Sequence, residues 1–190
     1  MKKVILAALA STAVLLIWGI TYWQIIYELL KIYNTSPDAE KVAELLQESG
    51  TATGTYFYPW PRNTDETFQQ FVTKHAHGPF FKLSYIREGV NPQTPKKMIG
   101  GILHYLSVTF LAALIIHLIG PDKIGFRKKV LILFLAGSIG TIFIQLGDPI
   151  WFHLPWDYSL GILVYELVSW LIIGIMTALI MKGDADKNLA

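Results

Sequence analysis

The chain has 190 residues, 53% of them hydrophobic and 16% charged, with a formal net charge of +2. A charge so close to zero leaves no basic footprint for nucleic acid, so we expect no nucleic-acid partner. The chain contains no cysteine, which excludes disulfides, thiolate metal sites, iron–sulfur clusters and haem attached through cysteine.

Four long apolar segments dominate the sequence, and Glu166 is the only carboxylate within them. Each segment is about long enough to cross a bilayer, because a helix rises ~1.5 Å per residue and the hydrocarbon core is ~30 Å thick. The sequence therefore predicts an all-α transmembrane fold, a four-helix membrane bundle with a small α/β extracytoplasmic insertion between spans 1 and 2. The segments are Val4–Ile26, Met98–Ile119, Val130–Gly147 and Ser159–Met181.

The N-terminal span, within residues 1–30, has the charged start of a signal peptide but a longer apolar run. It lacks a small-residue cleavage site at its far end, so we predict an uncleaved signal anchor. Lys and Arg gather at one end of the spans, whereas residues 148–158 contain neither. The positive-inside rule then places both termini in the cytoplasm, with residues 182–190 as a tail, and residues 31–97 in the periplasm. This pattern is typical of a multi-pass protein of the bacterial inner membrane.

Lys96 and Lys97 oppose this orientation, because they lie at the end without other positive charge. They belong to a long loop, and long loops weigh less in the orientation of a membrane protein. We therefore keep both termini on the cytoplasmic side and assign residues 98–181 to spans 2–4.

Residues 31–97 are too polar for lipid and carry signals of ordered structure. Ser36 as N-cap and Pro37 at the first helical position predict a helix, which Gly50 ends. Residues 54–58 combine Gly, Thr, Tyr, Phe and Tyr, which predicts a strand stopped by Pro59.

A second helix and strand complete the predicted α/β cap. Asn63 and Glu66 have the spacing of a capping box before an apolar run, and Gly78-Pro79 breaks the helix that follows. Residues 80–86 then predict a second strand. We expect this cap to rest on the outer ends of the spans.

Aromatic side chains are concentrated in the cap and in the connection between the last two spans, residues 148–158. One interpretation is packing at the membrane interface, where amphipathic rings are stable; the other is the rim of an outward-facing pocket for a partner or an apolar ligand. We favour interface packing. Asp157 also suits the positive end of the last helix dipole. The candidate rim residues are Tyr58, Trp60, Trp151, His153, Trp156 and Asp157.

Polar side chains within the spans gather at the predicted outer ends. His104 and Glu166 lie ~9 and ~10 Å below those ends, and Gln145 and Asp148 lie near the outer end of the third span. We therefore predict a buried polar cluster of these four residues, in which His104 faces Glu166 directly or through water. The favoured interpretation is a clamp that locks helices together; the alternative is a proton relay or a site that polarises a ligand.

Small residues at i, i+4 spacing predict where helices approach closely, because short side chains let two backbones come together. Such pairs occur on the first span, and a similar stack occurs on the third. The residues are Ala7 with Ser11, Ala8 with Thr12, and the series Gly137, Thr141 and Gln145.

No motif predicts catalysis or a bound metal. His75 and His77 invite a metal site with His153, but imidazoles two residues apart converge easily only in an extended chain, and this pair lies at a helix end. His104 and His117 lie ~140° apart around one helix, unlike paired haem ligands. There is no P-loop, Gly-x-Ser-x-Gly or HExxH motif. We predict no catalytic residue, no metal and no cofactor, which favours a non-enzymatic protein.

Several short motifs spread over most of the chain carry a family resemblance. They are Gly54-Thr55-Tyr56-Phe57-Tyr58-Pro59, Arg87-Glu88-Gly89, Gly101-Ile102-Leu103-His104, Gly147-Asp148-Pro149-Ile150-Trp151 and Pro155-Trp156. With these motifs the chain resembles a group of uncharacterised four-span proteins of the bacterial inner membrane. The resemblance implies the same four-span layout with an outer insertion, and it implies no activity.

Three functional hypotheses follow. The first is an accessory or assembly subunit or a small binding module, embedded in the lipid bilayer beside a membrane-protein partner or as a homo-oligomer. The alternative is a pocket for a lipid, a quinone or another apolar small molecule in the outer leaflet under the cap. A proton-coupled transporter or channel ranks last, because the inner half of the spans offers no continuous polar path.

Overall fold

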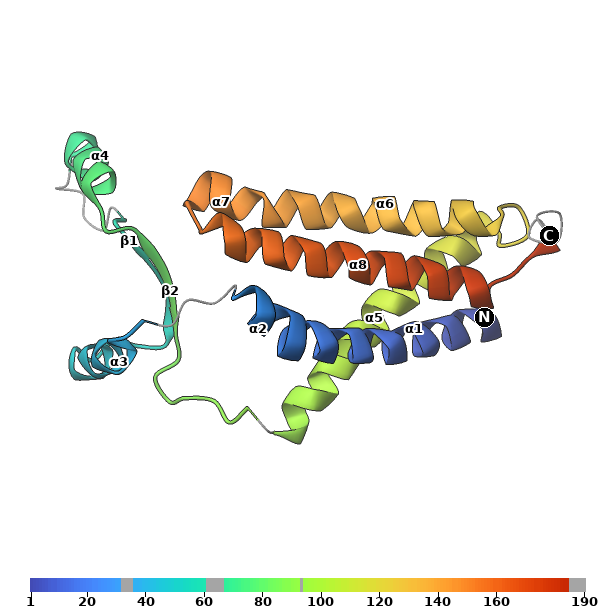
Figure 1. Ribbon diagram of the computed structural model, residues 1–190, viewed down its shortest axis with the longest axis horizontal. Helices are drawn as coiled ribbons and strands as arrows, with labels where there is room; N and C mark the ends of the chain where they lie inside the picture. Colours follow the sequence, from blue (N-terminus) through green and yellow to red (C-terminus); the bar gives the residue numbers. More distant parts are fainter. Residues whose placement is uncertain (32–35, 61–66, 93, 185–190) are drawn as a thin grey trace.

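The computed structural model of the protein describes residues 1–31, 36–60, 67–92 and 94–184. It is mostly helical, and a two-stranded sheet lies in the insertion between the first two long helices (Figure 1). This confirms the predicted combination of four long apolar helices and a small α/β insertion. The helices long and apolar enough to cross a membrane are Lys2–Leu30, Pro95–Ile119, Phe126–Phe152 and Trp156–Ile180.

The first long helix contains a π-helical turn near its end. It consists of α1 (Lys2–Thr21), the π-turn η1 (Tyr22–Ile26) and α2 (Tyr27–Leu30). The backbone N–H of Tyr27 donates to the carbonyl of Tyr22 five residues earlier, which brings both buried rings onto one face. The Tyr22 hydroxyl then donates to the carbonyl of Gly161 on the last helix. The π-turn thus fastens the first helix to the last.

The connection between the last two predicted spans, residues 148–158, is mostly helical. Pro149 lies in the first turn of a short helix, where a missing N–H costs nothing, and the third apolar helix therefore continues to Phe152. His153, at a φ of 51°, then ends it in the left-handed region. The elements after the insertion are α5 (Pro95–Ile119), α6 (Phe126–Gln145), α7 (Gly147–Phe152) and α8 (Trp156–Ile180).

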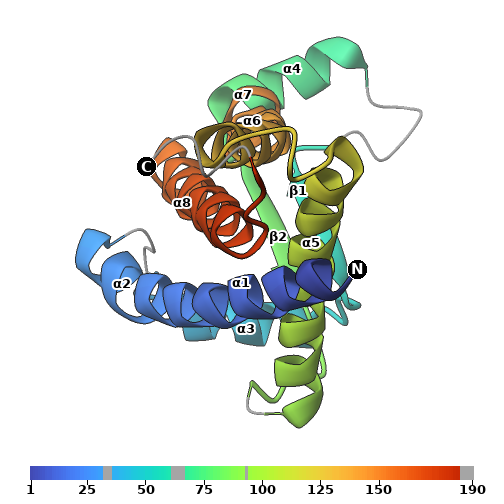
Figure 2. The ribbon, with the colours of Figure 1, turned by 90° about the vertical axis from the view of Figure 1, so that its right-hand side faces the viewer.

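A crossing of small side chains joins α1 to α5. The Thr109 hydroxyl lies 3.0 Å from the carbonyl oxygen of Ala8, to which it can donate. The hydroxyls of Thr12 and Thr109 share a hydrogen bond of 2.9 Å, and Ala112 and Ala113 beside them are buried. The predicted close contact at Ala8 and Thr12 is therefore confirmed. At this contact α5 crosses α1 obliquely, and its Pro95 end swings away from α6 and α8 (Figures 1 and 2).

The packing of α6 on α8 uses two glycines. A Cβ atom at Gly137 would overlap the ring of Trp170, and a Cβ at Gly174 would lie 3.1 Å from the carbonyl oxygen of Val130. These positions let the two helices run side by side, as Figure 1 shows. The predicted close contact on the third span is confirmed at Gly137.

A lysine secures the end of the bundle that carries both chain termini, which we call the terminal end. Lys129 is fully buried, and its ammonium donates to the carbonyl of Met181, just after α8, at 2.9 Å. A cation there satisfies a carbonyl at the negative end of the helix dipole. The sequence pattern placed Lys129 with the flanking charges, and its burial was not foreseen. The ammonium of Lys3 likewise donates to the carbonyl of Lys182 at 3.0 Å.

The insertion forms a small cap at the other end of the bundle, which we call the cap end (Figure 1). Its strands β1 (Gly54–Tyr58) and β2 (Phe81–Tyr85) pair antiparallel, with Gly54 opposite Tyr85. Both predicted strands are confirmed within one residue at each end. Beyond the strands, the Thr53 hydroxyl donates to Glu88 at 2.8 Å and holds the pKa of that carboxyl below its ordinary value. The sheet thus continues as a side-chain contact between the two flanking loops.

The two cap helices begin later than the sequence predicts. For α3 (Ala39–Glu48) the N-cap is Asp38, and the predicted cap Ser36 instead accepts a hydrogen bond from the Asp38 backbone N–H at 3.3 Å. For α4 (Phe68–His77) a capping box joins Thr67 and Gln70. The predicted capping box at Asn63 and Glu66 lies outside the described residues. Gly78 ends α4, as predicted.

We expect Thr109→Val to lower the free energy of unfolding by ~0.6–1.7 kcal/mol, the range for hydrogen bonds between membrane helices. The substitution keeps the branched shape and removes the hydroxyl that joins α5 to α1. Reversible unfolding in detergent micelles measures the change. Ser107→Ala is the matched control, because the exposed Ser107 hydroxyl donates only within its own helix. Equal losses in the two variants would contradict the role of this crossing.

Candidate functional site

The oblique course of α5 leaves a cavity of about 350 Å³ between α5, α6 and α8. Several lining residues, including His104, Gly140 and Ile144, are exposed, so the cavity opens at the side of the bundle. It is lined by Leu15 from α1, by His104, Tyr105 and Val108 from α5, by Ala136, Gly137, Gly140, Thr141 and Ile144 from α6, and by Tyr165, Glu166, Ser169, Trp170 and Ile173 from α8. We call this space the lateral cavity.

The carboxylate of Glu166 faces the lateral cavity from the half of α8 nearer the cap. It lies ten residues, or about 15 Å, from the first residue of that helix. The side-chain amide of Gln145 on α6 donates to Glu166 Oε1 at 3.0 Å, and both residues are half-buried. Within the described part of the chain, Gln145 is the only side chain that hydrogen-bonds Glu166. The predicted association of these two residues is therefore present, and it leaves much of the carboxylate's capacity to accept hydrogen bonds unused.

Two tyrosines add hydroxyl groups to the same cavity. The hydroxyls of Tyr105 on α5 and Tyr165 on α8 share a hydrogen bond of 2.6 Å. Behind them, the indole N–H of Trp18 donates to Ser169 Oγ at 3.1 Å, and Ser169 donates to the Tyr165 carbonyl at 2.8 Å. These bonds hold the polar side of the cavity in place from three helices.

The lack of a side chain at Gly19 provides room for these hydroxyls. A Cβ atom there would lie 3.0 Å from the hydroxyl of Tyr105 and 3.4 Å from that of Tyr165. The tyrosine pair therefore requires a glycine at position 19, unless a neighbouring side chain moves. Sequence reasoning did not single out Tyr105 or Tyr165. The available signal was their position directly beside His104 and Glu166 in the chain.

The structure brings His104 and Glu166 to one cavity without a direct bond. His104 is exposed, and its ring centroid lies 5.6 Å from that of Tyr105. In the described residues the His104 ring forms neither a hydrogen bond nor an ion pair with Glu166. The predicted clamp between these two side chains is therefore not formed directly, and their pairing through water stays a prediction.

Asp148 lies apart from the other three members of the predicted polar cluster. It belongs to α7 and lines a separate surface hollow with Trp151 and neighbouring apolar residues at the end of α6. The continuation of the third helix through α7 carries it there. The predicted cluster thus divides: His104 and Glu166 line the lateral cavity, Gln145 hydrogen-bonds Glu166, and Asp148 lies apart.

The predicted rim residues do not line the lateral cavity. Four of the six predicted rim residues are aromatic side chains that are exposed. Asp157 Oδ1 accepts a hydrogen bond from the backbone N–H of Tyr158 within the first turn of α8. The exposed side chains are Tyr58, Trp60, Trp151 and Trp156.

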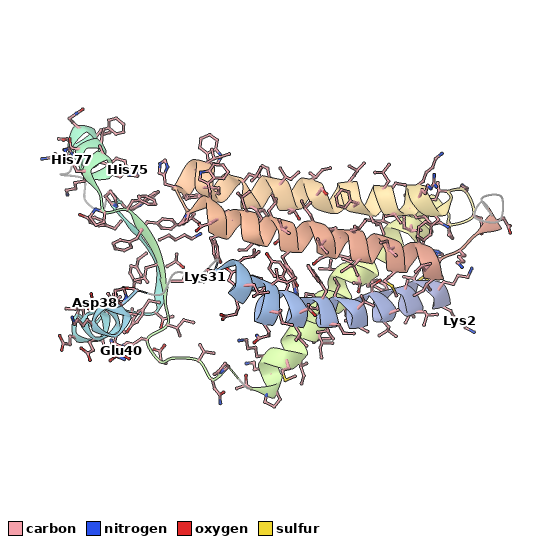
Figure 3. The ribbon with its side chains drawn as sticks, in the orientation of Figure 1. Lys2, Lys31, Asp38, Glu40, His75 and His77 are labelled. Atoms are coloured by element: carbon pink, nitrogen blue, oxygen red, sulfur yellow. The ribbon has the colours of Figure 1, made fainter. Side chains whose placement is uncertain are left out.

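His153 and its neighbours instead connect the cap with the bundle. The His153 ring centroid lies 5.4 Å from that of His75 and 5.6 Å from that of Phe80. Beside it, Phe152 lies 5.8 Å from Phe57 on β1. Figure 3 shows His75 on α4, beyond the ends of the long helices. These contacts place the cap on the end of α7, so the aromatic residues there hold two parts of the fold together.

Metal chemistry finds no support in the site geometry. Across the residues that the structure describes, no group of three or more His, Asp or Glu side chains could hold a metal ion. His75 and His153 meet across the interface between cap and bundle, whereas His77 bonds to the Thr73 carbonyl of its own helix. The three histidines therefore do not converge.

Comparison with known proteins adds no family to this description. No protein-family model, curated protein or solved structure matches the chain. The resemblance based on short motifs therefore stays a prediction, and the function has to be argued from the site itself. The site is a space with mostly apolar walls that also carries hydroxyl, imidazole and carboxylate groups, a combination that suits a molecule with an apolar body and a small polar head.

We expect Gly137→Ala to lower the free energy of unfolding by ~1–3 kcal/mol, because the added methyl group overlaps the Trp170 ring and forces overpacking. Gly140→Ala is the matched control on the same helix, since a Cβ there meets nothing within 4 Å. The control should be neutral or stabilising by up to ~1 kcal/mol, from helix propensity alone. Reversible unfolding in detergent compares them, and similar effects would contradict the described packing of Trp170.

Proposed function

We propose that this protein is an integral membrane protein that binds an amphipathic, membrane-soluble molecule in the lateral cavity. The observation that carries the proposal is the cavity itself, which has mostly apolar walls and is also lined by His104 from α5 and by Tyr165 and Glu166 from α8. Its volume of about 350 Å³ lies within the ~300–1,000 Å³ of small-molecule sites. The cavity favours the ligand-binding alternative over the accessory-subunit role, for which the described residues offer no comparable feature.

Access to the cavity supports entry of a ligand from the lipid. The half of α5 nearer the cap carries large exposed side chains, among them Met98, Ile99 and Leu103. In a bilayer such a surface faces hydrocarbon, and the opening between α5 and α6 lies on it. A molecule dissolved in the membrane would therefore reach Glu166 without crossing water.

We further propose that the protein lies in the bacterial inner membrane with both termini in the cytoplasm and the cap in the periplasm. The support is the distribution of charge: the terminal end carries Lys3, Arg127 and Lys128, and the short connection at the cap end carries no Lys or Arg. The residues that line the lateral cavity lie around the middle of the four long helices, so the cavity would then lie near the mid-plane of the bilayer.

Single cysteines test this orientation directly, because the chain has none of its own. Ser84→Cys on β2 and Lys128→Cys at the start of α6 both place the thiol on an exposed residue. A membrane-impermeant maleimide applied to spheroplasts should label Ser84→Cys at once and Lys128→Cys only after the membrane is permeabilised. The reverse order would overturn the proposed orientation and leave the cavity unchanged.

We expect Gly140→Leu to remove the ligand that co-purifies with the protein. The new side chain projects into open space within the cavity and meets no neighbour at its Cβ, so it fills the site without disturbing the packing. Gly101→Leu is the matched control: that helical position is equally open and lies outside the cavity. Protein purified from native membranes is extracted with organic solvent, and mass spectrometry quantifies bound small molecules per chain.

The proposal requires wild type and Gly101→Leu to retain close to one bound molecule per chain. Gly140→Leu should retain at least about tenfold less of that molecule per chain. Equal retention in all three proteins would place the bound molecules on the general lipid-facing surface and would contradict a site in the cavity. Retention in none of them, with folded protein by circular dichroism, would count equally against it.

A further inference from the structure

The side chains that line the lateral cavity restrict what its ligand can be. Among the described residues no Lys or Arg lines the cavity, and Glu166 is the only carboxylate that does. Proteins usually hold a phosphate with Arg or Lys side chains, or with the N-terminal N–H groups of a helix. Glu166 lies about 15 Å from the N-terminus of its helix, so no helix end offers such groups beside it. The head group of a phospholipid would therefore be poorly satisfied.

The hydrogen-bonding groups of the cavity include both donors and acceptors. Glu166 accepts one hydrogen bond, from Gln145, and an ionised carboxylate can accept more. The bond between Tyr105 and Tyr165 uses one of the two phenolic hydrogens, and the other can be donated. The imidazole of His104 lines the same cavity and can donate or accept a hydrogen bond.

We infer that the ligand is a quinone or its quinol, with the ring in the lateral cavity between Glu166 and Tyr165 and the apolar tail passing out between α5 and α6. The carbonyl oxygens of a quinone need donors, which the tyrosines and His104 supply. The hydroxyls of a quinol need acceptors, and the Glu166 carboxylate is the strongest one in the cavity. The ring is uncharged in both states, which suits a cavity without cations.

This inference rests on the proposed function and narrows it to one head group. The volume of about 350 Å³ admits a single substituted ring and the first part of its tail. The rest of the tail would lie along the exposed side chains of α5, in the bilayer. The inference concerns binding alone and assigns no electron transfer to the protein.

Binding to the full-length protein in detergent tests the inference, with three probes: a short-tailed benzoquinone, its quinol and phosphatidylglycerol. Native mass spectrometry or equilibrium dialysis gives each Kd. We expect the quinone and the quinol to bind wild type, and both to bind Gly140→Leu at least about tenfold more weakly. Phosphatidylglycerol should bind wild type and Gly140→Leu with the same Kd.

Glu166→Gln then separates the two redox states. Loss of a hydrogen bond to a charged group should weaken the quinol about tenfold or more, whereas the quinone, which needs donors, should change less than about threefold. Glu28→Gln is the control, because Glu28 is an exposed carboxylate on α2 outside the cavity. The Gln145 amide can still bond to Gln at position 166, and circular dichroism establishes that the variant is folded.

The possible results distinguish the quinone assignment from the proposed function. Binding of phosphatidylglycerol that disappears in Gly140→Leu, with no binding of quinone or quinol, would overturn the quinone assignment and leave the cavity as a ligand site. Equal loss of quinone and quinol in Glu166→Gln would overturn the assigned role of the carboxylate. Absence of binding by all three probes, together with no molecule retained from native membranes, would overturn the proposed function as well.

Discussion

The Thr109 hydroxyl marks the point on which the arrangement of this bundle depends. It bonds to the Ala8 carbonyl and to Thr12, and small side chains beside it let α5 approach α1 closely. In the membrane that we propose for this protein, no hydrophobic driving force would favour one helix pairing over another, so packing and such hydrogen bonds would decide the geometry. From this crossing α5 diverges from α6 and α8 toward Pro95, and the lateral cavity is the space that this divergence leaves.

Other contacts fix the remaining helices. Gly137 receives the Trp170 ring, Gly174 lies against Val130, and Lys129 bonds to the Met181 carbonyl at the terminal end. At the cap end the π-turn allows the Tyr22 hydroxyl to reach α8. The packed pair of α6 and α8 therefore forms one wall of the cavity, and α5 forms the other. Glu166, which would be costly on a lipid-facing surface, lines the cavity from α8.

Local sequence patterns predicted the helices and strands well. They predicted less well which side chains of different helices face one another. The strand at Gly54–Tyr58 and the four long helices follow from composition and hydropathy, which act over a few residues. The bond between Gln145 and Glu166 was within reach because both face the bundle by helical periodicity. Asp148 was misplaced because Pro149 falls in the first turn of α7 and does not break the helix. The pairing of Tyr105 with Tyr165 and the burial of Lys129 depend on the angle at which separate helices cross, which no single segment encodes.

The half-anchored course of α5 also makes this helix a lever. Its fulcrum is the crossing at Thr12 and Thr109, its short arm lies in the tight packing around Ala112 and Ala113, and its long arm ends at Pro95. A rotation about the fulcrum that widened the cavity would stretch the hydrogen bond between Tyr105 and Tyr165, which joins the long arm to α8. The cap precedes the long arm in the chain and contacts α7 through Phe152 and His153, so the same rotation would also change how the cap rests on the bundle.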